Sequence, residues 1–286
     1  MEESVGECVV LRRFLGKDPP CLHTCTCEKF PSYYSGRNRK GCWVAHTALC
    51  ILEAIRIKDD ILAVIEKRGI KWKTLLFALL LHDSGKVSKD YTSKGGPRIR
   101  HNETSAQIAY EVLGRLLERG YADKDERKVV SRACFLHMEY YEWKSLKKGG
   151  FTTISQITTP AVTVELADDV QKPLENLKLV LEEADVLNEA IYSVISGIQE
   201  IKKLKLKPSN YTIDQSDQYS WKVQLKTIAL QWFILLLDNR ASSARRGADA
   251  YWDRLLEDAR STYPDVIKFS DQLLITLRGK LTPLPR

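Results

Sequence analysis

The chain has 286 residues, of which 44% are hydrophobic, so it can bury one large core or two small ones. Its 44 basic and 37 acidic side chains leave a formal charge of +7, which suits a polyanionic partner without requiring one. The N-terminus lacks the pattern of a signal peptide, and the longest apolar runs, 75–81 and 232–237, are too short to span a bilayer. These features exclude a membrane-spanning protein and lead us to expect a cytoplasmic one.

The first half of the chain changes from an irregular to a helical pattern near residue 41. Residues 1–40 lack apolar periodicity and predict an irregular, Cys-containing N-terminal extension. Apolar residues then recur at helical spacing over 43–57 and 72–82. Two glycines and a proline predict a loop over 91–100, followed by a helix from His101 to about Glu118.

The second half is also mainly helical. An amphipathic helix is predicted over 128–143, and the loss of periodicity after it predicts an insertion at about 147–215, helical within 174–206. The apolar run 221–238 predicts a last helix that ends in the carboxylate of Asp238. We therefore expect a mostly α fold, with an extension at 1–40 and a main domain at 41–286.

Four of the five histidines form one ordered series with two aspartates. The series is His46, His82, Asp83, His101, His137 and Asp238. Imidazole nitrogen and carboxylate oxygen suit Mn, Fe, Ni, Co, Zn or Mg, and such a centre generates a hydroxide that can attack phosphorus. Since an unpaired carboxylate is costly to bury beside an apolar run, a cation is the natural partner of Asp238. The series predicts hydrolysis of a phosphate ester.

The same residues carry a resemblance to a known family. Their order resembles the HD phosphohydrolase superfamily, and the strings LLLHDSGK (79–86), HNETSA (101–106) and LLDNRASSARRG (236–247) resemble the HD nuclease of type I CRISPR interference. The likeness spans about 42–250 and implies a helical HD core that cuts single-stranded DNA. The chain has no G-x-x-x-x-G-K-[ST] phosphate loop, so the resemblance implies a separate helicase subunit and an RNA-guided surveillance complex (Cascade) as partners.

The resemblance also assigns roles to residues. It places His46, His82, Asp83 and Asp238 at a first metal site and His101 and His137 at a second, with Asp83 bridging them. It makes Asp83, Lys86 and Ser242 catalytic. Many members of the family have a His-His pair where this chain has His137 followed by Met138. The number of ions, one or two, therefore stays open, with Glu139 as an alternative oxygen ligand.

Basic residues near these ligands are candidates for contact with nucleic acid, namely Lys86, Arg98, Arg100 and Arg245. Two other functions remain open. One is an HD hydrolase of a nucleotide or cyclic nucleotide, which would use the same ligands in a closed pocket. The other is a nucleic-acid-binding subunit whose catalysis has weakened.

Four of the seven cysteines lie before residue 30. Cys21, His23, Cys25 and Cys27 fall within one short stretch and, with Cys8 or Cys42, offer the ligands of a tetrahedral structural zinc. Their spacing is not that of a standard zinc knuckle. Reduced cysteines that pack locally are the alternative.

Overall fold

The computed structural model describes residues 6–35, 38–93, 101–137, 163–201, 203–205 and 220–244, and these are mostly helical, as predicted. The main helices are α1 (Gly6–Leu15), α2 (Trp43–Arg56), α3 (Lys58–Lys67), α4 (Trp72–Leu81), α5 (Lys89–Thr92), α6 (His101–Glu118), α7 (Lys124–Leu136), α9 (Gln171–Glu183), α10 (Glu189–Gln199) and α11 (Ser220–Ser243). Within these ranges no helix combines the length and the hydropathy that a membrane span requires.

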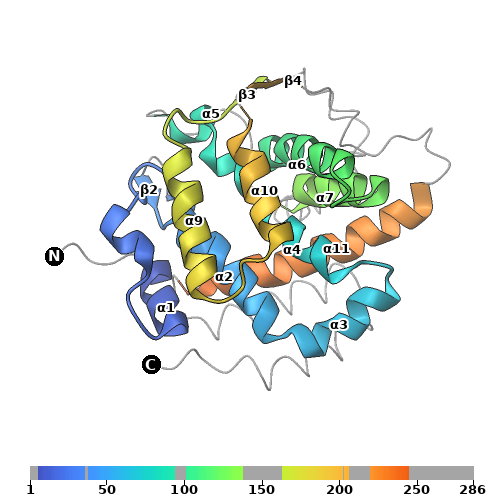
Figure 1. The fold of residues 1–286 in the computed structure, drawn as a ribbon, viewed down its shortest axis with the longest axis horizontal. Coiled ribbons are helices and arrows are strands. Elements are labelled where there is room, and N and C mark those ends of the chain that lie inside the picture. Colours follow the sequence, from blue (N-terminus) through green and yellow to red (C-terminus); the bar gives the residue numbers. More distant parts are fainter. Residues whose placement is uncertain are drawn as a thin grey trace, which may run out of the picture.

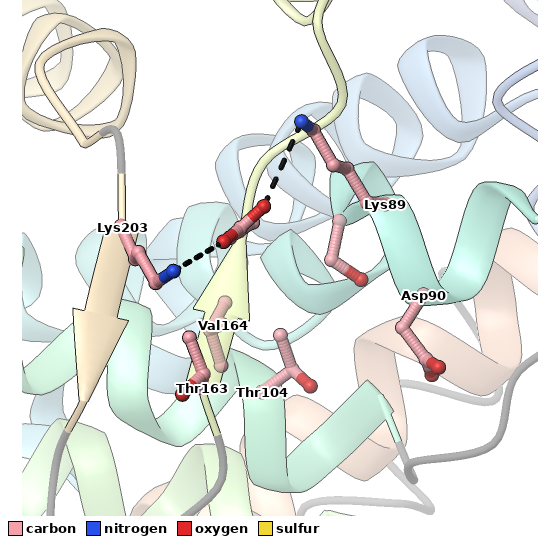
Figure 2. Close-up of a pocket in the computed structure, with 8 residues that line it drawn as sticks. Lys89, Asp90, Thr104, Thr163, Val164 and Lys203 are labelled. Atoms are coloured by element: carbon pink, nitrogen blue, oxygen red, sulfur yellow. Dashed lines mark ion pairs between the residues drawn. The ribbon is translucent and has the colours of Figure 1, made fainter.

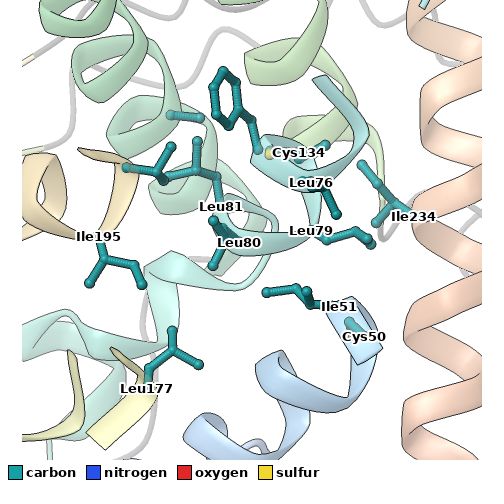
Figure 3. Close-up of a cluster of buried hydrophobic side chains, with 14 of the residues drawn as sticks. Cys50, Ile51, Leu76, Leu79, Leu80, Leu81, Cys134, Leu177, Ile195 and Ile234 are labelled. Carbon is teal, nitrogen blue, oxygen red and sulfur yellow. The ribbon is translucent and has the colours of Figure 1, made fainter. Parts of the chain in front are cut away.

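Helix α4 forms the centre of the fold. Its sequence WKTLLFALLL is apolar on all sides, and every residue from Thr74 to Leu81 is buried, as expected for a helix that other helices surround. It contacts α2, α6, α7, α10 and α11. Figure 3 shows Leu79 and Leu80 among side chains of these neighbours, including Ile51, Ile195 and Ile234. The buried end of α4 leads directly into His82 and Asp83.

Helices α6 and α7 lie side by side (Figure 1) and form the most extensive helix pair among the described residues. Helix α7 begins at a capping box, in which Asp123 and Glu126 each accept a hydrogen bond from the other's backbone N–H. Because a short connection joins the two helices, the start of α6 lies near the end of α7. This arrangement brings His101, the first residue of α6, close to His137, which follows α7.

The N-terminal extension is more ordered than its sequence predicted. It contains α1, the 3-10 helix η1 (Pro20–Thr24) and a hairpin in which β1 (Tyr33–Ser35) pairs with β2 (Asn38–Lys40), Tyr34 opposite Arg39. Leu11 is fully buried in the common core, and Ser32 Oγ donates to Glu7 Oε1 at 2.6 Å. The prediction of an irregular segment was wrong because α1 is short and buries few apolar side chains.

The described part of the mid-chain segment packs on the same core. Helices α9 and α10 lie side by side across the bundle (Figure 1), and α9 contacts α2 while α10 contacts α4 and α6. The single helical stretch expected at 174–206 is two helices, because Asp185 adopts φ 55° and Asn188 caps the start of α10. Strands β3 (Thr163–Glu165) and β4 (Lys203–Lys205) flank them as an antiparallel pair. The remainder of the expected insertion lies outside the described residues.

Candidate metal centre

The six side chains of the ordered series converge at one place in the fold. His46 comes from α2, and His82 and Asp83 follow α4. His101 begins α6, His137 follows α7, and Asp238 lies on α11. Helices thus carry or flank every member of the series, as predicted. Four of the six are buried and two, His101 and Asp238, are partly exposed, so the cluster lies deep in the bundle and reaches solvent at one edge.

Asp83 lies at the middle of the cluster, and its two carboxylate oxygens face different histidines. Oδ2 lies 3.3 Å from His46 Nε2 and 3.5 Å from His82 Nε2. Oδ1 lies 3.2 Å from His101 Nε2 and 3.6 Å from His137 Nε2. One carboxylate is therefore shared by two half-sites, the first defined by His46, His82 and Asp238 and the second by His101 and His137.

The histidines present ring nitrogens suited to a cation. His82 Nδ1 lies 2.8 Å from the carbonyl oxygen of Leu79, and His137 Nδ1 lies 2.6 Å from that of Cys134. A carbonyl accepts only, so each Nδ1 carries the proton and each Nε2 keeps its lone pair. The buried Nε2 of His82 has no hydrogen-bond partner. An orphaned lone pair at full burial is costly, and a metal ion would satisfy it.

Distances between the donor atoms fit metal coordination. His46 Nε2 is 2.9 Å from Asp238 Oδ1, and His101 Nε2 is 3.2 Å from His137 Nε2. Bonds of 2.0–2.2 Å place neighbouring ligands about 3 to 3.5 Å apart in octahedral or tetrahedral geometry. Cys50 Sγ, 3.9 Å from His46 Nε2, borders the first half-site. The donor set therefore fits one ion in each half-site.

The charges in the centre favour an ionised Asp83 and neutral imidazoles at His82 and His101, whereas neighbouring acidic groups outweigh burial and raise the pKa of His46 well above its usual range. Burial opposes ionisation of Asp83, but Lys86, whose Nζ is 2.6 Å from Oδ2, and the nearby histidines outweigh it and hold the pKa of Asp83 well below its usual range. Burial lowers the pKa of His82 to about 4, and burial with the charge of Lys86 does the same for His101. Neutral imidazole is the form that binds a metal.

A buried ion pair that we did not predict joins the two helices of the first half-site. Glu53 on α2 contacts Arg240 on α11, with Oε1 3.5 Å from Nε, and also contacts Arg56 at 2.7 Å. Glu53 lies two turns after His46, and Arg240 lies two residues after Asp238. This pair therefore holds the helix that carries His46 against the one that carries Asp238. The sequence signal that could have indicated this pair is a charged residue within each of two apolar helical runs.

Gly85 is required for the close approach of α6 to the HD doublet. A Cβ at this position would lie 2.2 Å from the backbone oxygen of His101 and 2.9 Å from the backbone nitrogen of Ser105. The Gly85 N–H also donates to Ser105 Oγ at 2.8 Å. Because the obstacle is backbone, α6 must move away from Asp83 if Gly85 gains a side chain.

We expect Gly85→Ala to displace His101 from Asp83 and to lower the free energy of unfolding by roughly 1–3 kcal/mol, as overpacking does. Chemical denaturation and a metal titration measure the two effects. Gly114→Ala, on α6, is the control, since its Cβ would meet only the guanidinium of Arg127 at the end of a flexible side chain. Wild-type stability and metal affinity in Gly85→Ala would contradict this role.

The remaining predicted site residues lie beside the centre or outside the described residues. Ser242 Oγ is 3.4 Å from Asp238 Oδ1, one turn along α11. Lys86 lies in the centre itself, on the 3-10 helix η2 (Ser84–Val87). Four others fall outside the described residues, namely Arg98, Arg100, Glu139 and Arg245.

A surface pocket of about 360 Å³ is lined by residues of α5, α6 and the β3–β4 pair (Figure 2). Lys89 and Lys203 line it, but both face Glu165, at 3.6 and 2.8 Å. Lys89 also lies 2.8 Å from Asp168. These lysines are neutralised within the protein, so the pocket offers little attraction to a phosphate.

Comparison with known families agrees with this geometry. Residues 43–172 match the family model described as HD domain. The match is confined to this segment. It indicates a metal-dependent phosphohydrolase and includes five of the six convergent residues, whereas Asp238 joins from α11 beyond the match. Neither the curated proteins nor the solved structures contain a match to this chain.

Proposed function

We propose that this protein is a metal-dependent nuclease that degrades single-stranded DNA in CRISPR interference. It would act in the cytoplasm with a separate helicase subunit and an RNA-guided surveillance complex (Cascade). The observation that carries the hydrolytic part is the carboxylate of Asp83, which two sets of imidazoles and Lys86 share. The nuclease subtype is supported by the strings around His82, His101 and Asp238.

The first half-site would hold one ion through His46, His82, Asp83 and Asp238, and the second half-site would hold another through Asp83, His101 and His137. Mn, Ni, Co, Fe and Mg are the candidates, and the imidazole-rich donor set favours the transition metals. When bound, such ions supply an activated water and polarise the phosphate. The carbonyls of Leu79 and Cys134 keep His82 and His137 in the required tautomer.

Substrate would enter at the more exposed edge of the centre. The side chains of His101 and Asp238 are 15% and 16% exposed, whereas that of Asp83 is 2% exposed. Ser242 lies at this edge through its contact with Asp238. In sequence, Arg98 and Arg100 precede His101, and Arg245 follows Ser242. Their positions suit contacts with the phosphates that flank the scissile bond.

Hydrolysis of a nucleotide or cyclic nucleotide is the second candidate, and the depth of the centre favours it. Four of the donor side chains, those of His46, His82, Asp83 and His137, are at most 2% exposed, which suits a small phosphate ester. Single-stranded DNA, mononucleotides and cyclic nucleotides should be compared with the metal-loaded protein. Cleavage of DNA in preference to the small esters supports the nuclease. The reverse order supports the second candidate, and tight metal binding without turnover points to a binding subunit.

Lys86 supplies a matched test of the proposed site. Its ammonium nitrogen contacts the carboxylate of Asp83 at 2.6 Å. In the proposal it therefore orients that carboxylate and attracts the substrate phosphate. We expect Lys86→Ala to lower metal-dependent cleavage by about 100-fold. Lys89→Ala, three residues later, removes a surface lysine that pairs with Asp168 and should retain wild-type activity. Equal activity of the two variants in initial-rate assays would contradict a role for Lys86.

A further inference from the structure

Three cysteines from separate elements meet where the N-terminal segment packs against the start of α2. Cys8 lies on α1, Cys27 lies in the segment after η1, and Cys42 is the N-cap residue of α2. Their sulfur atoms all lie within 4.8 Å of one another, and all three residues are buried. We call these residues the sulfur cluster. It is distinct from the HD centre, which contains none of them.

A fourth sulfur lies against this cluster. Cys27 is within hydrogen-bonding reach of Cys8, Cys42 and also Cys25. A thiol is a weak donor and its sulfur a weak acceptor, so four buried or partly buried sulfurs gain little from hydrogen bonds to one another. A zinc ion bound by four thiolates at about 2.3 Å would place the sulfurs about 3.8 Å apart. The sulfurs of Cys8, Cys27 and Cys42, all within 4.8 Å of one another, approach this spacing.

We propose that Cys8, Cys25, Cys27 and Cys42 form a structural zinc site of four cysteines. This set differs from the one expected from sequence spacing. Cys25 is exposed as a residue, but its thiol hydrogen-bonds to Cys27, whereas no such contact joins Cys21 or His23 to Cys27. A closed set of four thiolates leaves no open position, so its role is structural.

The site would connect the N-terminal segment to the start of α2. The backbone N–H of His46 donates to the carbonyl of Cys42 at 2.9 Å, and that of Trp43 donates to the carbonyl of Phe30 at 3.0 Å. Trp43 Nε1 also donates to the backbone carbonyl of Asp83 at 3.0 Å. A zinc ion at Cys42 would therefore fix the first turn of α2, which presents His46 to the HD centre.

Metal analysis of the full chain tests the proposal. The background is Asp83→Asn, in which the HD centre is disrupted, and the protein is purified in reductant and washed with chelator. We expect one zinc per chain to remain, and its loss in Cys27→Ser. Cys134→Ser, which changes a buried cysteine outside the cluster, should keep it. Absence of zinc from the chelator-washed parent, or its retention in Cys27→Ser, would overturn the proposal.

A second measurement does not depend on the folding of a variant. The native protein loaded with Co²⁺ should show sulfur-to-cobalt charge-transfer absorption, and titration of the zinc form with an organomercurial should release one zinc. Bound cobalt without this absorption, or a disulfide among the four cysteines in the reduced preparation, would overturn the site.

Two further variants test the identity of the fourth ligand. Cys25→Ser should weaken zinc retention by about tenfold or more, while Cys21→Ser should not. The opposite result would replace the fourth ligand and overturn the assignment of Cys25.

Discussion

Asp83→Asn is expected to lower metal-dependent hydrolysis by roughly 1,000-fold or more. The amide keeps the shape of the side chain but removes the charge that faces both half-sites through Oδ1 and Oδ2. An amide also offers only one oxygen, so it cannot serve both sets of histidines. Initial rates across a wide range of metal concentration measure the effect, and recovery at high metal would contradict a shared ligand.

The same substitution leaves Lys86 buried without its partner, so the free energy of unfolding should fall by about 3 kcal/mol. The double variant Asp83→Asn, Lys86→Met separates the two effects, because it removes both charges and keeps a side chain of similar length. We expect it to regain stability in chemical denaturation while remaining inactive. An active double variant would show that Asp83 acts only as the partner of Lys86.

His82→Ala and His137→Ala should differ in how metal rescues them. The first half-site offers four protein ligands and the second three, if Asp83 serves both, so the second ion should bind more weakly. We expect His137→Ala to raise the metal concentration for half-maximal activity by about 10-fold or more, with activity recovering at saturation. His82→Ala should stay inactive at every metal concentration.

The two histidines form a matched pair for this comparison. Each is buried, each follows the last turn of a helix, and each Nδ1 donates to the carbonyl three residues earlier. Truncation therefore creates similar cavities and similar orphaned carbonyls, so stability should fall by comparable amounts. Metal titrations of activity with both variants decide the outcome. Equal and unrescued loss in the two would contradict a weaker second half-site.

Helix positions could be predicted where the apolar pattern was strong. The boundaries of α2, α4 and α6 fall within about two residues of the sequence expectation, since each has a clear periodic pattern or an abrupt end. Helix α1 was missed because its apolar face is narrow. The break between α9 and α10 was missed because Asp185 gives no sign in the sequence that it adopts a left-handed conformation.

The convergent residues could be chosen from the sequence because histidine is rare in this chain and the ordered series resembles a known family. Their arrangement around the two oxygens of Asp83 could not be derived, since it depends on how α6, α7 and α11 pack. The same holds for Glu53 with Arg240 and for the sulfur cluster. In each case residues far apart in the chain meet only through tertiary packing.

Anomalous diffraction from crystals of the full chain soaked in Mn²⁺ tests the central claim most directly. We expect a peak about 2.2 Å from Asp83, His46, His82 and Asp238, with a weaker one beside His101 and His137. Both peaks should be absent in Asp83→Asn crystals soaked in the same way. Strong manganese peaks elsewhere in the molecule, with none at Asp83, would contradict a metal centre built on this carboxylate.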